Sequence, residues 1–494
     1  MSSKITIDEL EKYLWGSAVL LRTHVDAGAY KQYIFPLLFF KRLSDVYDEE
    51  CEKIKAEYGD EALDWEENHQ FQIPDGAHWN DVRNVSENVG KAIIEAFHKI
   101  EAANPEKLQG IFGDASWTNK NRLPDRLLKD MLEHFSTKTL SVANCPADEL
   151  GQGYEYLIKQ FADDSGHTAQ EFYTNRTVVN LMTEMLKPQP GESIYDPTCG
   201  SAGMLISAVA YLKEQKKEWR NLSIYGQEIV TLTSAIARMN LLLHGVQDFE
   251  IANADTLKTP AFTDHAKLQQ FDLILANPPY SIKNWDRTAF ESDKYGRNFL
   301  GTPPQGRADY AFFQHILKSM DPVTGRCAIL FPHGVLSRND EQSMRKVLVQ
   351  LDLVEAVIGI GKSLFYNSPM EACIVICKSQ KSADRKKKVL FVNAKNEVTR
   401  KNAQSYLEPE HIKRIASAYE SFSIESGFSN IATQEEIAAN DYSLGIPKYV
   451  AGAVEETEEE MNMEEVLTSW LCSSGRVQEE YSLLNDLIGG VDNA

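Results

Sequence analysis

Between residues 151 and 450, short apolar runs typical of strands alternate with longer runs of helical periodicity. The helical pattern is clear in "GMLISAVAYLKEQ" and "TSAIARMNLLLHG". This alternation is typical of a parallel sheet covered by helices on both faces, so we expect a doubly wound α/β domain. The candidate strands are residues 193–197, 222–228, 249–255, 271–277, 326–332 and 353–360.

Two further apolar runs, residues 371–378 and 388–394, are separated by the polar stretch "SQKSADRKK". Two strand-like runs with a polar connection are typical of a β-hairpin. We therefore expect these two strands to pair with each other and to close one edge of the sheet.

The first 150 residues have apolar side chains that recur mostly at three- and four-residue spacing, which indicates helices. One such run covers residues 29–49 and contains Pro36, which we expect to kink or to start the helix. Further helices are expected at 88–102 and 123–135. Residues 1–150 are therefore predicted to form an all-helical N-terminal domain.

The last stretch, residues 451–494, carries eleven acidic residues and a single arginine. Its run "EETEEE" is typical of a solvated linker or helix start. Beyond this run, apolar residues recur at helical spacing in two amphipathic segments, which need a surface of this chain or of a partner to bury against. We therefore expect a helical domain at 1–150, an α/β domain at 151–450 and an acidic helical tail at 451–494 for partner contact.

The chain has a formal net charge of −21. A protein that binds DNA alone usually carries a basic patch, which releases counterions from the phosphates. If this chain acts on nucleic acid, we therefore expect a partner to supply much of the affinity. We find no membrane-spanning apolar run and no secretory signal, and the seven scattered cysteines form no CxxC pair. We therefore expect a cytoplasmic protein without a metal site or a disulfide framework.

The stretch "YDPTCGSAGML" follows an expected strand and leads into an expected helix; its residues Asp196 to Gly203 are called the glycine turn below. In open α/β sheets, the crevice at the carboxyl ends of the strands binds ligands. Gly200 and Gly203 permit conformations and close approaches that a side chain would prevent. The helix N-terminus offers N–H groups to an anion, and Asp196 can bind a cationic amine. A ligand with both an ammonium and a carboxylate group suits this turn, although an ordinary strand–turn–helix without a ligand stays open.

Two acidic residues lie at the ends of the next two expected strands. Glu228 can accept hydrogen bonds from ribose hydroxyls, and Asp255 can contact an adenine amino group. Either acid alone is more often a solvated loop residue. Their shared position at successive strand ends favours a role in ligand binding.

The fourth expected strand ends in "NPPY", residues 277–280, which we call the clamp. Pro278 and Pro279 lack N–H groups and have a fixed φ, so they hold the preceding carbonyl groups rigidly. The amide oxygen of Asn277 and the carbonyl oxygen of Pro278 can then accept both hydrogens of one planar amino group. Tyr280 offers a ring for stacking. The clamp is therefore suited to bind an exocyclic NH2 on a π system. A simple Asn-Pro turn without a ligand is the less favoured alternative.

The stretches "DPTCGSAGML" and "NPPY" resemble motifs I and IV of the S-adenosylmethionine-dependent amino-methyltransferases, in the γ order. The preceding "GQGYEYLIKQFADDSGHTAQEFYTNRTVVNLM" resembles the modification subunit of type I restriction–modification enzymes. Its "EFYTNR" resembles their "(Q/E)(F/Y)(F/Y)TP(R/K)" wall against the cofactor, with Asn175 in place of proline. The stretches "LWGSAVLLR" and "NDYSLGIPKYV" are also similar to that family, although Ser443, Gly445 and Lys448 depart from its usual "NDYNLNIPRYV".

This resemblance implies a Rossmann-like S-adenosylmethionine methyltransferase sheet and an enzyme that methylates N6 of adenine in DNA. It implies that the flipped base is bound by Asn277, Pro278, Pro279 and Tyr280. It implies that S-adenosylmethionine is bound by Glu171, Phe172, Tyr173, Thr174, Asn175, Asp196, Thr198, Gly200, Ser201, Ala202, Gly203, Glu228, Asp255 and Asn277.

The resemblance also implies partners: DNA, a specificity subunit that reads the sequence, with two modification subunits for each, and a restriction subunit that translocates and cleaves DNA. A protein-glutamine N5-methyltransferase is an alternative, since an amide also presents an NH2 group attached to a π system, which NPPY could bind. The long N-terminal region and "EFYTNR" argue against it. A subunit that binds the cofactor without turnover is a second alternative, which the intact Asn277 and Tyr280 disfavour. Methylation of cytosine N4 is a closer variant.

Overall fold

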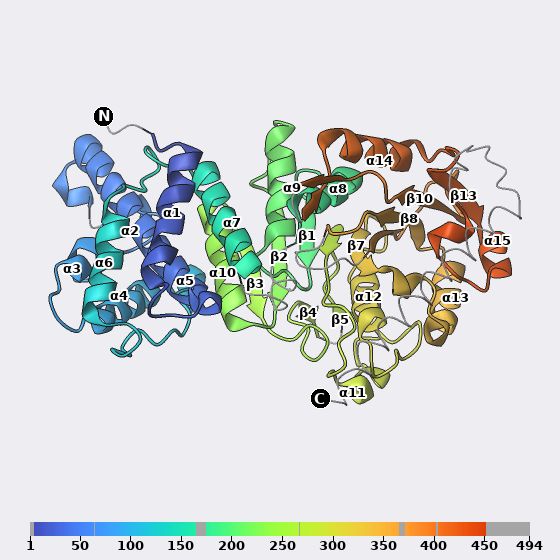
Figure 1. The fold of residues 1–494 in the computed structure, drawn as a ribbon, viewed down its shortest axis with the longest axis horizontal. Coiled ribbons are helices and arrows are strands. Elements are labelled where there is room, and N and C mark those ends of the chain that lie inside the picture. The colour runs from blue at the N-terminus through green and yellow to red at the C-terminus, as the bar shows by residue number, and fades with distance from the viewer. Residues whose placement is uncertain are drawn as a thin grey trace, which may run out of the picture. The chain divides into compact units, whose positions relative to one another are not determined.

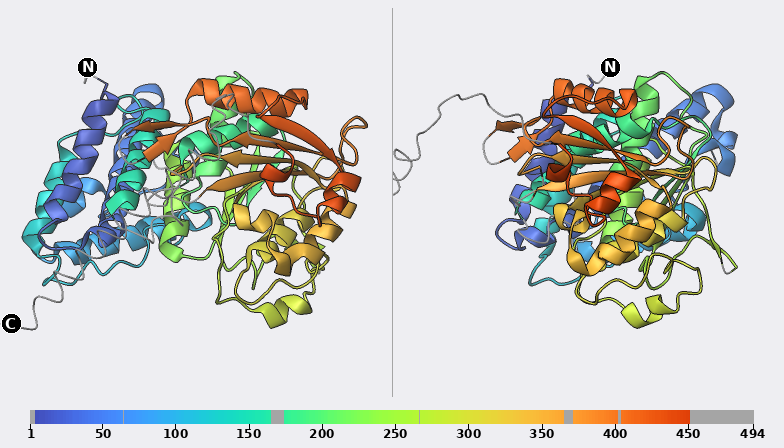
Figure 2. Two further views of the ribbon diagram at one scale, coloured as in Figure 1. Left: turned by 45° about the vertical axis from the view of Figure 1, so that its right-hand side comes forward. Right: turned by 90° about the vertical axis from the view of Figure 1, so that its right-hand side faces the viewer.

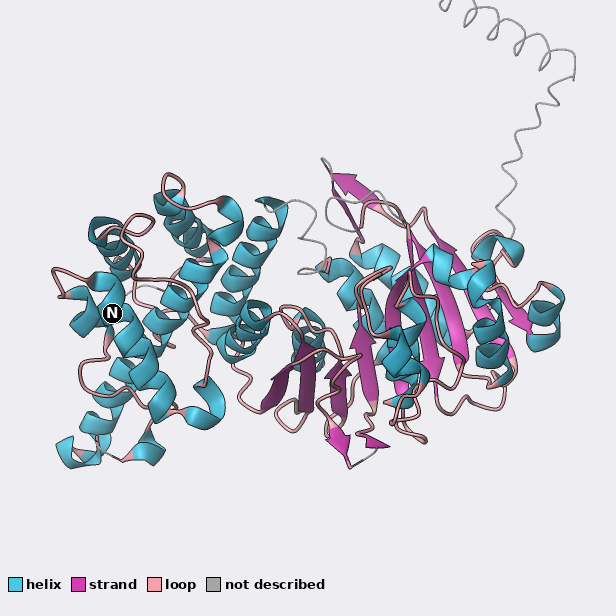
Figure 3. Cartoon of the chain, turned by 90° about the horizontal axis from the view of Figure 1, so that it is seen from below, coloured by secondary structure: helices cyan, strands magenta, loops and turns pink. Residues whose placement is uncertain are grey.

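The structure, a computed structural model, describes residues 4–63, 65–164, 174–265, 267–364, 371–401 and 404–450. The first part of the chain is built of helices, and the second is built on one large sheet (Figure 1, Figure 3). Among the described helices, none is long and apolar enough to cross a lipid bilayer. The tail at 451–494 lies outside the described residues, and the domain boundaries expected at 150 and 450 stay predictions.

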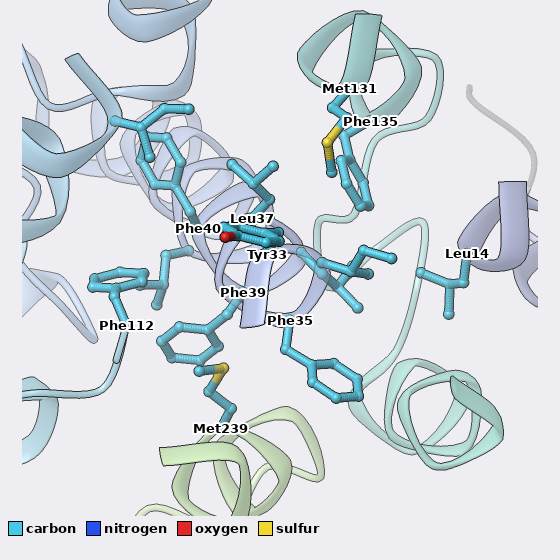
Figure 4. Close-up of a cluster of buried hydrophobic side chains, with 14 of the residues drawn as sticks. Leu14, Tyr33, Phe35, Leu37, Phe39, Phe40, Phe112, Met131, Phe135 and Met239 are labelled. Carbon is cyan, nitrogen blue, oxygen red and sulfur yellow. The ribbon is translucent and has the colours of Figure 1, made fainter. Parts of the chain in front are cut away.

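Helix α2, Lys31–Tyr58, runs through the middle of the helical part (Figure 4). Consecutive residues from Tyr33 to Asp45 are buried, which is the pattern of a helix surrounded by others. Pro36 lies inside α2 and does not start it. The other helices of this part are α1 Ile7–Leu21, α3 Trp79–Arg83, α4 Val89–Ala103, α5 Pro105–Leu108, α6 Asp125–Ser136 and α7 Ala147–Asp164.

The core of the helical part continues into the α/β part through helix α10, Thr231–Leu243. Met239 of α10 lies beside aromatic side chains of α2 in Figure 4. The hydroxyl of Tyr154, on α7, donates a hydrogen bond to the backbone oxygen of Ile236 at 3.4 Å. Apolar burial and hydrogen bonds therefore both join α10 to the helical part.

The α/β part is built on a nine-stranded sheet with the order β13-β10-β8-β9-β7-β6-β1-β2-β3. Strand β9 is antiparallel to β7 and β8, β13 is antiparallel to β10, and the other pairs are parallel. This arrangement confirms the predicted α/β fold. The strands are β1 Ser193–Asp196, β2 Ser223–Glu228, β3 Phe249–Asn253, β6 Leu273–Ala276, β7 Arg326–Pro332, β8 Val354–Ile360, β9 Ala372–Lys378, β10 Lys388–Ala394 and β13 Ser429–Thr433. Two small ladders pair β4 Thr263–Asp264 with β5 Lys267–Leu268, and β11 Thr399–Lys401 with β12 Gln404–Tyr406.

The predicted hairpin of residues 371–378 and 388–394 is wrong. Both strands form, as β9 and β10, but β8 lies between them. All residues of β9 except Lys378 are buried, so an interior position removes more apolar surface from water than an edge position would. The polar connection lies beside the segment that precedes β8, since the N–H of Lys387 donates to Oδ2 of Asp352 at 2.9 Å. The edge beyond β10 is formed by β13, which the sequence analysis missed.

Helices cover both faces of the sheet (Figure 2). Ala328 and Leu330 of β7 pack into a core with α8, α9 and α14, whereas Ile329 and Phe331 pack into a core with α12 and α13. This alternation is the two-residue period of a strand buried on both faces. The helices of the α/β part besides α10 are α8 Arg176–Leu186, α9 Gly203–Glu214, α11 Arg287–Glu291, α12 Asp309–Lys318, α13 Gln342–Gln350, α14 Pro409–Ser421 and α15 Gln434–Ala439.

Candidate active site

The strand order changes direction at β1, because the chain adds β2 and β3 on one side of it and β6 and β7 on the other. Strands β1 and β6 are parallel neighbours, with Tyr195 opposite Ile274. Parallel neighbours end at the same edge of a sheet, so Asp196 and Asn277 both lie at the carboxyl edge. Such a change of direction is where open α/β sheets bind their ligands.

One cavity at this edge, the strand-end cavity, joins three segments that are far apart in the sequence. Thr174 and Arg176 come from the segment that opens α8, and Asn277 follows β6. The residues that line it from the glycine turn and the start of α9 are Asp196, Thr198, Cys199, Gly200, Ser201, Gly203 and Met204. Predicted cofactor residues and the first residue of the clamp therefore share one cavity.

The remaining predicted site residues fall into two groups. Glu171, Phe172 and Tyr173 lie outside the described residues. The second group does not line the strand-end cavity, and it comprises Asn175, Ala202, Glu228, Asp255, Pro278, Pro279 and Tyr280. Most of this second group are neighbours in sequence, or hydrogen-bond partners, of residues that do line it.

The glycine turn is held by hydrogen bonds from its backbone N–H groups to strand β2. The N–H of Cys199 donates to the backbone oxygen of Gln227 at 2.9 Å. The N–H of Gly200, whose φ is +52°, donates to Oε2 of Glu228 at 3.1 Å. The other oxygen of Glu228 accepts the N–H of Val230 at 2.9 Å. Glu228 therefore braces the turn in addition to the ribose contact predicted for it.

Gly203, the first residue of α9, allows a charged side chain to approach the turn. A Cβ atom at this position would overlap the guanidinium group of Arg176. That guanidinium donates to both carboxylate oxygens of Glu155, on α7, at 2.7 and 2.9 Å. The glycine turn is therefore in contact, through Arg176, with a helix that packs in the core of the helical part.

Asp196 is a buried acid, with an exposed fraction of 2%. Burial raises the pKa of its carboxyl to about 8, although Oδ1 accepts the N–H of Thr198 at 3.0 Å. The charged group that acts on this pKa is another acid, Glu228, which raises it further. A buried carboxyl of this kind gains from a cationic ligand, because a cation would compensate for the charge that burial disfavours.

The side chain of Asn277 is oriented by two hydrogen bonds. Its Nδ2 donates to Oγ1 of Thr174 at 3.0 Å, and its Oδ1 accepts the hydroxyl of Tyr280 at 2.7 Å. Burial raises the pKa of Tyr280 well above its usual value, so this hydroxyl stays protonated and remains a donor. An amide oxygen has two lone pairs, so Oδ1 of Asn277 can accept one further hydrogen.

Asp255 follows β3, beside the strand that carries Glu228. Its Oδ1 accepts the N–H groups of Leu257 and Lys258 at 2.9 and 3.1 Å. The next residue, Thr256, donates its hydroxyl to the backbone oxygen of Pro197 at 2.5 Å. The loop that carries Asp255 is therefore tied to the glycine turn, while part of the Asp255 carboxylate is used to shape its own loop.

Comparison with known families agrees with this geometry. A model of the N-6 DNA methylase family matches residues 146–460, which is more than half of the chain. The chain belongs to the N-6 DNA methylase family. A model of the HsdM N-terminal domain matches residues 10–135 of the same chain.

Relatives of this N-6 DNA methylase are methylase subunits of type I restriction enzymes. The MjaVIII subunit of Methanocaldococcus jannaschii is 32% identical, over 92% of this chain and 80% of that protein. The HindI subunit of Haemophilus influenzae is 30% identical, over 83% of this chain and 98% of that protein. A solved type I methyltransferase subunit from Streptococcus thermophilus is 30% identical, with a TM-score of 0.79 over 90% of this chain and 100% of its own. This N-6 DNA methylase is therefore the methylation subunit of a type I restriction–modification system and uses S-adenosylmethionine.

Asn175 stands where the family resemblance expects proline, and its side chain has a clear structural part. Its Oδ1 accepts the N–H of Thr177 and so caps α8, while its Nδ2 donates to the backbone oxygen of Ser405; both distances are 3.0 Å. Asparagine is among the residues preferred at a helix N-cap. The substitution therefore keeps the start of α8 well defined without proline.

Three residues of the strand-end cavity were missed by the sequence analysis: Arg176, Cys199 and Met204. Each lies inside a stretch that carried the resemblance, so the signal was position within "EFYTNR" or "DPTCGSAGML". Among the described residues, no group of three or more histidine, cysteine or acidic side chains is placed to hold a metal ion.

Proposed function

We propose that the strand-end cavity and the clamp transfer a methyl group from S-adenosylmethionine to N6 of an adenine that has left the DNA duplex. The observation that carries this proposal is that Asn277 and the glycine turn line the same cavity. The donor and the amine that accepts the methyl group would then be held side by side, which supplies much of the rate of a transfer reaction.

The residues around the strand-end cavity fit the methyl donor. Its ammonium group would compensate the buried carboxyl of Asp196, and the N-terminus of α9 would face its carboxylate. Glu228 and Asp255 would contact the ribose and the adenine ring. When bound, S-adenosylmethionine supplies an electrophilic methyl group on a sulfonium, so the chain has to position and activate the amine, whose surplus proton passes to water after the transfer.

The clamp would activate an adenine amine whose lone pair is delocalised into its ring. Oδ1 of Asn277 and the carbonyl oxygen of Pro278 would each accept one hydrogen of this amine, which makes the nitrogen more electron-rich in the transition state. Among the described residues, no hydrogen bond ends on the carbonyl oxygen of Pro278. Stacking on Tyr280 would offset part of the cost of removing the base, by about 1–3 kcal/mol.

The assembly proposed for this chain follows from its charge and family. With a net charge of −21 the chain is repelled by DNA, so we propose that a specificity subunit reads the sequence and supplies most of the affinity. We further propose two copies of this chain for each specificity subunit, a separate restriction subunit and a cytoplasmic location.

The test is tritium transfer from labelled S-adenosylmethionine to DNA by the chain purified with its co-expressed neighbouring gene products. We expect label in DNA, recovered as N6-methyladenine after digestion to nucleosides. We expect the chain alone to bind S-adenosylmethionine but to bind DNA weakly. N4-methylcytosine as the product, or label in protein glutamine, would show that the methyl group goes to a substrate other than N6 of adenine. Tight, sequence-specific DNA binding by the chain alone would contradict the proposed division of labour.

A further inference from the structure

The residue that follows the clamp, Ser281, has an unusual backbone conformation. Its φ is +53°, in the left-handed region that residues with a side chain seldom adopt. The N–H of Ser281 donates to Oδ1 of Asp309 at 2.8 Å. This hydrogen bond ties the end of the clamp to the first residue of α12.

Asp309 is itself fixed by an ion pair. Its exposed fraction is 1%, and its second oxygen, Oδ2, accepts Nη1 of Arg338 at 2.6 Å. A buried carboxylate is costly unless it is paired and hydrogen-bonded. Each oxygen of Asp309 accepts one of the hydrogen bonds that compensate for its burial. The carboxylate therefore joins the clamp to the segment that follows β7.

Arg338 has little freedom to move. It packs closely on Gly334, where an added Cβ atom would clash with its guanidinium, and it lies 3.5 Å from Oε1 of the buried Glu341. Glu341 is fully buried in the same segment, and burial raises its pKa to about 7. The position of Arg338 is therefore set by the packing of the whole turn after β7.

This turn is held in place by the stretch "NDYSLGIPKYV", for which the predicted chemistry gave no role. The N–H of Leu444 donates to the backbone oxygen of Leu336 at 2.8 Å. Nε of the buried Arg345 donates to the backbone oxygen of Tyr442 at 3.1 Å. A continuous series of contacts thus runs from residues 440–450, through Arg338 and Asp309, to the clamp.

We propose that Asp309, held by Arg338, is a positioning residue that fixes the clamp for the incoming adenine amine. This inference rests on the proposed function of the clamp. Asp309 does not line the strand-end cavity, so its removal should disturb the acceptor side and leave donor binding unchanged. Because contiguity alone does not show coupling, the test has to measure both the hydrogen bond at Ser281 and the reaction.

The experiment compares Asp309→Ala, Asp309→Asn and the control Asp340→Asn. Asp309→Asn keeps an oxygen for the N–H of Ser281, and it also guards against an alanine variant that fails to fold. Asp340 is a nearby exposed acid that pairs with Arg307 at 2.8 Å, so its replacement removes a negative charge while both hydrogen bonds of Asp309 stay in place. Hydrogen–deuterium exchange of the purified chain reports on the Ser281 amide, and methylation by the complex reports kcat.

For Asp309→Ala we expect faster exchange in peptides that contain Ser281, unchanged exchange in the glycine turn, and a kcat that is about 10- to 100-fold lower, as small misplacements of reacting groups cause. The Kd for S-adenosylmethionine should stay within about twofold. Asp309→Asn should recover part of kcat, and Asp340→Asn should match the wild type. Unchanged exchange at Ser281, or a kcat for Asp309→Ala equal to that of Asp340→Asn, would overturn the proposal. Full activity of Asn277→Ala would instead contradict the proposed function of the clamp. The exchange at Ser281 would still decide whether Asp309 fixes the clamp in place.

Discussion

The two sides of the strand-end cavity are built in different ways. On the donor side, the N–H groups of the glycine turn donate to the backbone oxygen of Gln227 and to the carboxylate of Glu228, which both belong to the adjacent strand. On the acceptor side, the partners come from distant segments, since the side chain of Asn277 donates to Thr174 and the N–H of Ser281 donates to Asp309. Donor binding should therefore be most sensitive to changes within the turn and its adjacent strand, and methyl transfer to the loss of polar atoms from distant segments. The two functions should be separable by mutation.

The largest expected effect on the acceptor side comes from Asn277→Ala. The variant loses an oxygen that would stabilise the developing charge on the amine, and removal of one such group typically lowers kcat by about 100- to 1,000-fold. The Kd for S-adenosylmethionine should change by less than about tenfold, because the glycine turn is held independently. Single-turnover methylation and equilibrium binding of the donor measure the two effects.

Asn277→Asp is the matched control, because it keeps an acceptor oxygen at the same place. It should retain more activity than the alanine variant. If Asn277→Ala abolished donor binding as severely as methylation, the two sides would act as one unit and the comparison would fail.

An intermediate effect is expected on the donor side from Gly203→Ala. The added methyl group would displace Arg176 from its place beside the turn and strain its ion pair with Glu155. Overpacking of this kind costs about 1–3 kcal/mol, so the Kd for S-adenosylmethionine should rise by about 10- to 100-fold. At saturating donor, kcat should fall much less than in Asn277→Ala. Isothermal titration and kcat at high donor concentration test both statements.

Gly28→Ala is the control for Gly203→Ala. No atom lies near enough to meet a Cβ at Gly28, and its φ is not positive, so this variant should bind the donor as the wild type does. Equal Kd values for S-adenosylmethionine in the two variants would show that Arg176 moves away at no cost. Donor binding would then not depend on the close approach of Arg176 to the glycine turn.

The donor side was predictable from the sequence because its signals are local. A strand, a glycine turn and a helix follow each other within 193–214, and the observed β1 and α9 start at the first residues of the predicted stretches. Glu228 ends its strand as predicted, whereas Asp255 lies two residues beyond the end of β3 and not within it; the parallel order brings both strand ends to the same edge. Short-range periodicity was sufficient there.

The support of the clamp was not predictable in the same way. Its partners are spread from Thr174 to Leu444, and no pattern in one stretch indicates that Asp309 will meet Ser281. The same limitation explains the wrong hairpin, since the insertion of β8 between β9 and β10 is a choice made by tertiary packing. Pairing between distant segments depends on burial in the assembled sheet, which a local pattern does not contain.

The smallest expected effect, on the donor side again, is a dependence of donor binding on pH. The raised pKa of Asp196, about 8, means that its carboxyl carries a proton in the free protein at neutral pH. The ammonium group of the donor favours the ionised form, so binding should release this proton. The Kd for S-adenosylmethionine should then fall by up to about tenfold for each unit by which the pH rises between about pH 6 and 7.5.

The same shift predicts how stability depends on pH. The ordinary pKa of an aspartate, which applies to the unfolded chain, is 3.8, so between pH 3.8 and about 8 the folded protein binds one proton that the unfolded chain has released. The contribution of Asp196 to the free energy of unfolding therefore falls as pH rises through this window. Asp196→Asn should remove this loss and raise the stability of the donor-free protein at about pH 7.5, while it weakens donor binding.

Titration calorimetry of donor binding, in two buffers of different ionisation enthalpy, should show close to one proton released by the wild type and close to none by the variant. Proton release by both proteins would assign the titration to another group and would leave the donor side without its cation-binding acid.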